Sequence, residues 1–332
     1  MTSKEKRNNV LFILFFLFSI LLPAESKSEW FKTQQGIMGT NVVVDIWHAD
    51  TGIAEKCSEK VFAEMRRIDE LMSPFKKDSE LAKINQQASK QEVKISDELF
   101  KLIELSLKFS EKSAGAFDIT FASVGSLYNY RQRQKPSAKV ISEKLKFINY
   151  HNIKLNKANS SIKFTQDGVR IDLGGIAKGY AVDNGIAILK TCGIANGLVS
   201  AGGDSRILGD RRGRPWVMGV RHPRKKNDVV VKLPLSNVAI STSGDYERYF
   251  IEDSKRYHHI IKPGTGKSVD STWSATIIGD KAVLTDVLST TLFVLGAKQG
   301  LKLIDDEYKN VDAIIIDSKG KMFYSSGLVA PK

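Results

Sequence analysis

The sequence predicts an α+β fold, in which helices pack against largely antiparallel sheets. Two long amphipathic helical patterns precede a region of short strand-like runs, and these runs follow one another through glycine-rich turns. Runs joined in this way are typical of antiparallel hairpins, whereas a strict alternation of strand and helix would favour a parallel sheet. The chain has 332 residues, of which 42% are hydrophobic, enough for a globular core.

The first half is predicted to hold a strand and two helices. The strand-like run NVVVDIWHA begins at Asn41, and a helix follows over 52–73, where Ile53, Cys57, Val61, Met65, Ile68 and Met72 recur at spacings of three and four. Residues 97–113 repeat this pattern and end before Gly115. Residues 131–168 are polar and lack a long periodic run, so they are expected to form an exposed excursion.

The second half alternates turns with short strands. Residues 169–193 read as strand, glycine turn and helix, and further strands are expected within 197–209, 216–220, 229–235, 238–242 and 273–279. Asp280 is predicted to cap a helix that ends at Gly296. A short helix near 298–308 and a hairpin over 313–325 complete the pattern.

Residues 1–26 are typical of an export signal. Basic residues precede an apolar run of 13 residues from Val10 to Leu22, which is shorter than a spanning helix, and Pro23 and Ala24 follow. An uncleaved membrane anchor is the alternative. Either reading predicts an exported protein, periplasmic or anchored at the outer face of the inner membrane. The first cysteine is Cys57, so a lipid-modified cysteine at the end of the signal is excluded.

The charge and the cysteines leave several readings open. The formal net charge is +13, but the lysines are scattered and no aromatic–basic module is visible, so nucleic acid is not expected as a partner. The positive charge is explained either by solubility or by a basic surface that faces anionic lipid or an anionic substrate. Cys57 and Cys192 lie far apart in sequence; export permits a disulfide, and two buried thiols are equally compatible.

The segment GTGKS at 264–268 resembles the end of a phosphate-binding P-loop, but the rest of that motif is missing. The required first glycine falls on Ile261, and a β-rich stretch follows Ser268 in place of a helix. The sequence therefore argues against a nucleotide triphosphatase.

Other stretches carry groups suited to a phosphate or a metal. Gly174, Gly175 and Gly179 surround a predicted helix start beside Lys178, either to approach a phosphate or to make a tight turn. Asp286 and Thr290 share a helical face, and their oxygens suit Mg²⁺, although an Asp in a first turn and a packed Thr would look the same.

Three further side chains are candidates for acid–base or acceptor roles. His259 precedes a Pro-Gly turn, and histidine is the usual acid–base group near neutral pH. The segments SAGGDSRI and STSGDYERYF each place an Asp, Asp204 and Asp245, after small residues. Such segments make room for a ligand, or they are hairpin turns.

Taken in order, eight stretches resemble the ApbE family of FAD:protein FMN transferases. They run from GIMGT at 36–40 to DVLSTTLFVLG at 286–296, with LMSPFKKDSELAKIN, GAFDIT, IDLGGIAKGYAVD, GLVSAGGDSRILG, SGDYERYF and HIIKPGTGKS between them. The resemblance implies that residues 27–332 form one flavin transferase domain with a T-fold-like arrangement. It also implies Mg²⁺ as cofactor, FAD as substrate, and transfer of FMN to a threonine on a subunit of a membrane redox complex, with release of AMP. The alternatives are hydrolysis of FAD to FMN and AMP, or flavin binding without catalysis.

The resemblance also implies roles for individual residues. Asp286, Thr290 and the carbonyl of Gly175 would bind the metal, and His259 would lie beside the pyrophosphate and flavin. Because the acceptor hydroxyl is neutral, a base would help the transfer, and His259 or Asp245 could serve. FAD would be bound by Met38, Phe75, Ala116, Phe117, Asp118, Asp172, Lys178 and Ile261.

The chain departs from the family pattern at two positions. Lys262 stands where the family usually has Asp, and Phe75 stands where Tyr is frequent. The segment 270–276 loosely resembles an acceptor sequence, but it reads as a buried strand, which disfavours self-modification at Thr276. Nothing in the sequence indicates the oligomeric state.

Overall fold

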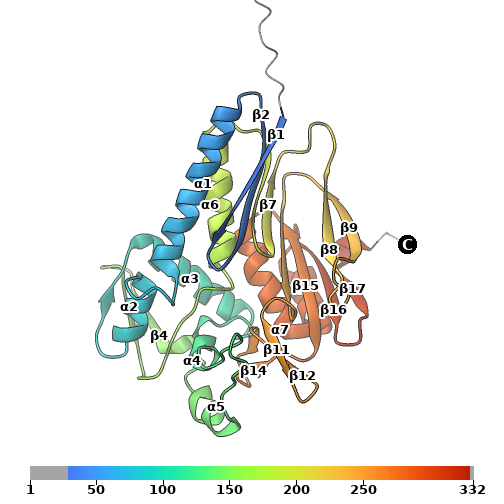
Figure 1. Ribbon diagram of the computed structural model, residues 1–332. Coiled ribbons are helices and arrows are strands. Elements are labelled where there is room, and N and C mark those ends of the chain that lie inside the picture. Colours follow the sequence, from blue (N-terminus) through green and yellow to red (C-terminus); the bar gives the residue numbers. More distant parts are fainter. Residues whose placement is uncertain (1–28, 330–332) are drawn as a thin grey trace, which may run out of the picture.

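The computed structural model describes residues 29–329, and its centre is a sheet of eight strands (Figure 1). Every pair of neighbouring strands in this sheet is antiparallel, which confirms the predicted α+β class. In spatial order the strands are β1 (Glu29–Ile37), β2 (Thr40–His48), β6 (Asn196–Ala201), β7 (Asp204–Leu208), β10 (Ala239–Gly244), β15 (Thr272–Gly279), β16 (Asp312–Asp317) and β17 (Met322–Tyr324).

Three long helices cover one face of the sheet: α1 (Thr51–Met72), α6 (Ala177–Thr191) and α7 (Ala282–Glu307). The apolar positions predicted for α1 face this core, except that Ile53 in its first turn is 38% exposed. The apolar stripe therefore decides how α1 lies on the sheet.

The α7 segment contains a break where the sequence predicted one. Gly296 has φ of 73°, a conformation that favours glycine, and it separates the first helix from the predicted second one. By length and composition α7 is apolar enough to cross a membrane, but its buried face supplies core residues such as Leu288, Leu292 and Phe293. Its apolar character is that of a core helix.

The predicted cap of α7 is wrong. Lys281 occupies the cap position and makes no side-chain cap bond. Instead the carboxylate of Asp183, in α6, accepts hydrogen bonds from the backbone N–H groups of Ala282 and Val283 at 2.9 and 3.0 Å. A side chain from a neighbouring helix thus caps α7, whereas the sequence predicted Asp280 as the cap.

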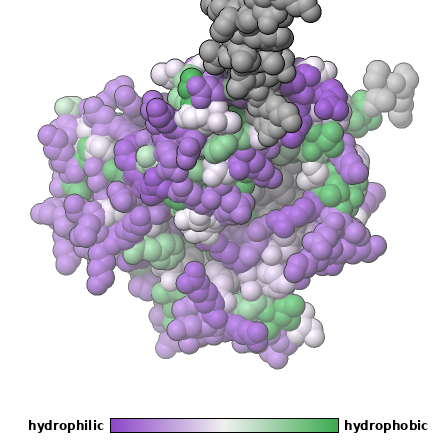
Figure 2. All heavy atoms as spheres, turned by 45° about the horizontal axis from the view of Figure 1, so that its top comes forward, coloured by the Kyte–Doolittle hydropathy of each residue, from purple (hydrophilic) through white to green (hydrophobic). Residues whose placement is uncertain are grey.

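A two-stranded hairpin packs on the opposite face of the main sheet. It consists of β8 (Trp216–Arg221) and β9 (Val229–Leu235). Trp216 packs there with Leu198 of β6 and Ile207 of β7 in a small separate core. Figure 2, in which the top of Figure 1 comes forward, shows a mostly hydrophilic surface with scattered hydrophobic spots.

The remaining elements form a lower layer beneath the ends of the long helices (Figure 1). They are α2 (Glu80–Gln87), β3 (Val93–Lys94), α3 (Asp97–Lys112), η1 (Ile119–Phe121), α4 (Ala122–Gly125), α5 (Ala138–Leu145), η2 (Tyr150–Asn152), β4 (Ile153–Asn156) and β5 (Ser161–Phe164). Short hairpins β11 (Tyr249–Glu252)–β12 (Lys255–His258) and β13 (Ile261–Lys262)–β14 (Lys267–Ser268) lie beside them, and η3 (Ser326–Leu328) follows β17.

The expectation of an exposed excursion over 131–168 needs correction. Residues 131–135 are exposed, but Ile153, Ile162 and Phe164 are at most 5% exposed and belong to the main core. Strands this short carry too few apolar positions to show a period in the sequence, which is why the prediction missed them.

Cys57 of α1 and Cys192 at the end of α6 form a disulfide, with their Cα atoms 6.2 Å apart. The sequence had left this pairing open. The GTGKS segment forms the turn after β13 and the strand β14, and the next described element is the strand β15, whereas a P-loop is followed by a helix. The predicted export signal, residues 1–26, lies outside the described residues.

Candidate active site

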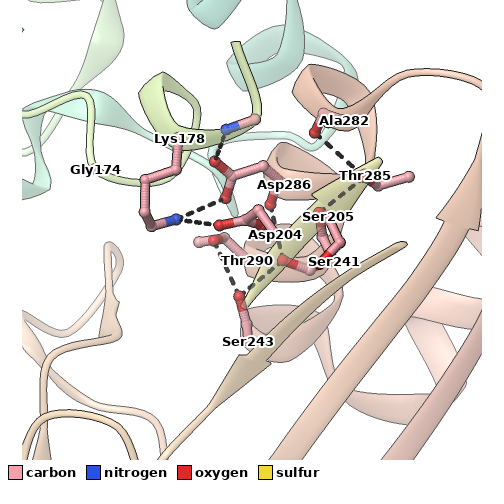
Figure 3. Close-up of polar contacts among 12 residues, drawn as sticks. Gly174, Lys178, Asp204, Ser205, Ser241, Ser243, Ala282, Thr285, Asp286 and Thr290 are labelled. Atoms are coloured by element: carbon pink, nitrogen blue, oxygen red, sulfur yellow. Dashed lines mark hydrogen bonds and ion pairs between the residues drawn. The ribbon is translucent and has the colours of Figure 1, made fainter. Parts of the chain in front are cut away.

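A cluster of polar side chains lies where α6, β7 and α7 meet (Figure 3). Lys178 stands in the first turn of α6, Asp204 opens β7, and Asp286 stands in the second turn of α7. The ammonium of Lys178 lies 2.5 Å from Asp204 Oδ2 and 3.4 Å from Asp286 Oδ1. Residues far apart in sequence thus place one cation between two buried carboxylates.

Gly179 allows this cluster to form. A Cβ at this position would lie 2.2 Å from the carbonyl oxygen of Ala282 and 2.8 Å from Cβ of Asp286. Only a residue without a side chain lets α6 and α7 approach so closely. The N–H of Gly179 also donates to Asp286 Oδ2 at 2.9 Å, which fixes the orientation of the carboxylate.

Burial dominates the electrostatics of the cluster. Desolvation, followed by repulsion from Asp204, raises the pKa of Asp286 to about 7. Burial opposes the charge of Lys178, but the two carboxylates outweigh this effect and raise the pKa of Lys178. The cluster therefore holds a charged lysine and the carboxyl group of Asp286, whose ionised form a second cation would stabilise.

The predicted metal ligands lie together beside this cluster. A Cβ on Gly175 would come within 3.3 Å of Thr290 Oγ1, so the glycine leaves space directly in front of that hydroxyl. Thr290 follows Asp286 by one helical turn, and its hydroxyl lies 3.3 Å from Ser243 Oγ. No cluster of three or more His, Cys, Asp or Glu side chains suited to a metal occurs within residues 29–329. A metal here would instead use one carboxylate, one hydroxyl and one carbonyl, a set of hard oxygen donors that fits Mg²⁺.

His259 borders the same region with an unused ring nitrogen. Its Nδ1 is buried and has no hydrogen-bond partner. Burial, and after it the positive charge of Arg248, lowers the pKa of His259 to about 3. The imidazole is therefore neutral near pH 7, and its Nδ1 can accept a hydrogen bond, but so low a pKa makes it a weak base. Its neighbour His258 is different, because its Nε2 is bound to the carbonyl of Val269 at 2.6 Å.

Asp172 and Arg248 line the approach to the cluster. The carboxylate of Asp172 accepts a hydrogen bond from Gly174 N at 2.6 Å, which shapes the glycine turn before α6. Burial raises the pKa of Asp172, while Arg248 and Lys178 oppose that shift. The positive charges of Arg248 and Lys178 thus influence the pKa values of both Asp172 and His259.

The turn between β1 and β2 lies next to Arg248, because a Cβ on Gly39 would be 3.5 Å from Nη2 of that arginine. Met38 has φ of 55° and Gly39 has φ of 68°, so a methionine occupies a conformation that usually needs Gly or Asn. A cavity of about 630 Å³ lies against this turn and is also lined by Arg66, Lys76 and Arg131. Backbone strain of this kind is frequent where a protein holds a ligand.

The structure does not support Asp245 as the base. Its two carboxylate oxygens accept hydrogen bonds from both terminal nitrogens of Arg224 at 2.7 and 2.6 Å, and Arg256 lies 3.8 Å away. The guanidinium of Arg224 also stacks on Trp273, 4.0 Å from the ring centre. A carboxylate held in a bidentate pair is a poor proton acceptor, so Asp245 positions the segment around it.

Three predicted FAD-binding residues, Phe75, Ile261 and Asp118, differ in burial and partners. Phe75 is 85% exposed, and Ile261 is buried against Val124 and Tyr128 in a separate apolar cluster. The carboxylate of Asp118 is buried, and it accepts bonds from Thr120 and from the backbone of Tyr150. Asp118 and Ile261 therefore support the fold, and the exposed Phe75 stays a predicted contact of FAD.

Two neighbouring predictions fare differently. Phe117 is buried, and its ring edge would lie 3.1 Å from a Cβ on Gly175, so its ring packs against the glycine turn beside Thr290. Ala116 is half-buried against the core that contains α7. Thr276 is fully buried in β15 and bonded to Thr242, so it is not an accessible acceptor.

Sequence reasoning missed the importance of Asp204, Arg248 and Ser243. The two small-residue segments had drawn attention to Asp204 and Asp245, but nothing in the sequence showed which of them would meet Lys178. Lys262, the charge reversal relative to the family, is exposed on the turn that packs against α5.

The comparisons with known proteins agree with this arrangement. Residues 38–315 match the profile of the ApbE family. The FAD:protein FMN transferase of Haemophilus influenzae is 30% identical over 83% of this chain and 83% of its own, and that of Treponema pallidum is 31% identical over 82% and 80%.

Solved structures show the same fold. The ApbE protein of Thermotoga maritima superposes with a TM-score of 0.84 at 35% identity, over 90% of this chain and 98% of its own. The flavin transferase ApbE of Vibrio cholerae gives 0.80 at 25% identity, over the same shares. From the match to its profile and the similarity to these relatives, the chain belongs to the ApbE family.

Proposed function

We propose that this protein is an FAD:protein FMN transferase. It cleaves the pyrophosphate of FAD, attaches FMN through a phosphoester to a threonine of an acceptor protein and releases AMP. The observation that carries this proposal is the convergence of Lys178, Asp286 and Thr290 around the space left by Gly175. A cation and hard oxygen ligands gathered at a glycine turn suit a pyrophosphate.

We further propose a Mg²⁺ ion held by Asp286, Thr290 and the carbonyl of Gly175. When bound, the ion neutralises charge on the pyrophosphate oxygens. The chain's own groups do the rest of the positioning. Lys178, held by Asp204, presents a fixed positive charge, and Gly174 and Gly175 let the backbone approach the phosphates.

Transfer of FMN forms one phosphorus–oxygen bond and breaks another. The oxygen of the acceptor threonine forms a bond to the phosphorus of the FMN half, and the bond from that phosphorus to the bridging oxygen breaks. The bridging oxygen leaves with AMP and keeps the electron pair. Nδ1 of His259, neutral and without a hydrogen-bond partner among the described residues, accepts a hydrogen bond from the threonine hydroxyl and orients it, and the hydroxyl proton leaves to solvent as the new bond forms.

Export is part of the proposal. Its support is the apolar run of residues 10–22 together with the Cys57–Cys192 disulfide, because disulfides persist in oxidising compartments. A threonine-bearing subunit of a membrane redox complex is the proposed acceptor class.

One incubation tests the activity. Purified protein, FAD, Mg²⁺ and a threonine-containing acceptor are mixed, and the masses of acceptor and nucleotides are recorded. An acceptor heavier by one FMN unit, with AMP released, is the expected result. Free FMN and AMP with an unmodified acceptor would replace the proposal with FAD hydrolysis, and intact FAD would leave a flavin-binding protein.

A further inference from the structure

Three of the four tryptophans of the chain gather at the end of the sheet farthest from the site. Trp30 opens β1 and is paired directly with Trp47 of β2. The ring of Trp30 meets that of Trp216 edge to face, with centroids 5.0 Å apart. Trp30 and Trp47 are both half-buried.

Arginines from the loop between β7 and β8 cover these rings. The guanidinium of Arg211 lies 4.6 Å from the Trp30 ring centre and 4.8 Å from that of Trp216. The guanidinium of Arg212 lies 3.9 Å from the Trp47 ring centre. Arg212 is exposed and has φ of 58°, so the loop holds it in a backbone conformation that is unusual for arginine. We call these five residues the Trp–Arg patch.

The patch carries more positive than negative charge. Arg214, exposed in the same loop, and Lys32, exposed on β1, add to it. Two acids lie nearby, which leaves an excess of positive charge: Asp45 lies 3.8 Å from Arg211, and Asp210 accepts hydrogen bonds from Asn196 and from the backbone of Gly213. Arg212 and Arg214 therefore present guanidinium groups to the surroundings without an ion pair among the described residues.

The position of the patch in the chain suggests what it meets. The apolar run ends at Leu22, and only residues 23–28 separate it from β1, a length that spans at most about 25 Å. The patch at the start of β1 is thus tied closely to that run. Tryptophan and arginine are the residues that favour the headgroup region of a bilayer, where a ring lies among the headgroups and a guanidinium binds phosphate.

We propose that the Trp–Arg patch binds the surface of an anionic lipid bilayer. The inference rests on the export part of the proposed function. The β1–β2 turn with Met38 lies at the other end of the nine-residue strand β1, roughly 30 Å away along the strand. A protein held by the patch would keep its site facing away from the lipid, open to an acceptor.

Vesicle binding tests the proposal. A chain that begins at Lys27 lacks the predicted export signal, residues 1–26, and contains all the core residues that the structure describes. This chain is sedimented with vesicles of phosphatidylcholine, alone or mixed with phosphatidylglycerol. Binding to the mixed vesicles that weakens with salt, with a blue shift of tryptophan fluorescence, is the expected result.

A pair of variants with equal loss of charge makes the test specific. Arg212→Ala with Arg214→Ala is expected to weaken binding about 25-fold, because each basic side chain near the surface contributes about five-fold. The control, Lys225→Ala with Lys226→Ala, removes two exposed lysines at the opposite end of the β8–β9 hairpin and should change binding less than about two-fold.

Three outcomes would overturn the proposal. They are equal binding to both vesicle types, equal weakening in the two variants, and a change of oligomeric state without a change in lipid binding, which would make the patch a contact between copies. Both variants should transfer FMN in solution at the wild-type rate. If the wild-type protein binds the mixed vesicles but transfers no FMN, the proposed function is refuted and the proposed lipid binding is not.

Discussion

The disulfide between α1 and α6 should supply a large part of the stability of the fold. Cys57 and Cys192 are separated by 135 positions, so the bond closes a long loop in the unfolded chain. In the chain-entropy treatment a loop of this length corresponds to about 5 kcal/mol at 25 °C. Domains are stable by only about 5–15 kcal/mol, so the bond would account for a third or more of the total.

Urea unfolding measures this contribution. The wild type is unfolded with and without reductant, alongside the variant Cys57→Ala with Cys192→Ala. Reduction should lower the free energy of unfolding of the wild type by up to about 5 kcal/mol. The variant should match the reduced wild type and ignore the reductant. A wild type whose midpoint does not move when a thiol assay shows both cysteines reduced would refute the reasoning.

Three further changes test individual contacts. Gly179→Ala should destabilise the protein by about 3 kcal/mol or prevent folding, because its Cβ would overlap the carbonyl of Ala282. The control Gly36→Ala should be tolerated, because a Cβ at that position would have open space around it. Equal melting temperatures of the two variants would contradict the close approach of α6 and α7. Asp183→Asn should lower the free energy of unfolding by about 1–2 kcal/mol, because it removes a negative charge at the start of α7 and beside Arg206. Asp280→Asn should lower it by less than about 0.5 kcal/mol. If urea unfolding shows the larger loss for Asp280→Asn, Asp280 is the cap after all. His259 has a folded pKa of about 3, below its unfolded value of 6.5, so as pH falls below 6.5 the unfolded state takes up a proton that the folded state does not, and stability is lost. Between pH 7 and 5 the wild type should lose about 2 kcal/mol more than His259→Asn, and parallel losses would show that His259 is not buried in its neutral form.

The fold was predictable where the pattern is long and local. The apolar stripe of α1 and the glycine that ends the first part of α7 depend on spacing and backbone freedom, which the sequence displays directly. The strands β4 and β5 escaped prediction because each has four residues, and their apolar side chains are buried in the main core, most of whose members lie far away in sequence. The cap of α7 escaped for the same reason, since Asp183 reaches it from another helix.

The sequence indicated which residues form the site, but not which side chains pair with one another there. Asp286, Thr290 and Gly175 come together as the family resemblance implied. The two Asp residues that follow small residues could not be told apart in the sequence, yet Asp204 meets Lys178 and Asp245 meets Arg224. Which cation each carboxylate finds is decided by the packing of β7 and of the segment after β10, and no local pattern encodes it.

FMN transfer by a pair of threonine variants tests the central claim most directly. Thr290→Val removes the hydroxyl that faces Gly175, and Thr291→Val removes one from the next residue of α7, which is buried and bonded to the carbonyl of Val287. With FAD, Mg²⁺ and acceptor present, Thr290→Val should lose at least about 100-fold in transfer rate while Thr291→Val keeps most of it. Equal rates in the two variants, with both folded, would contradict the assignment of this pocket as the catalytic metal site.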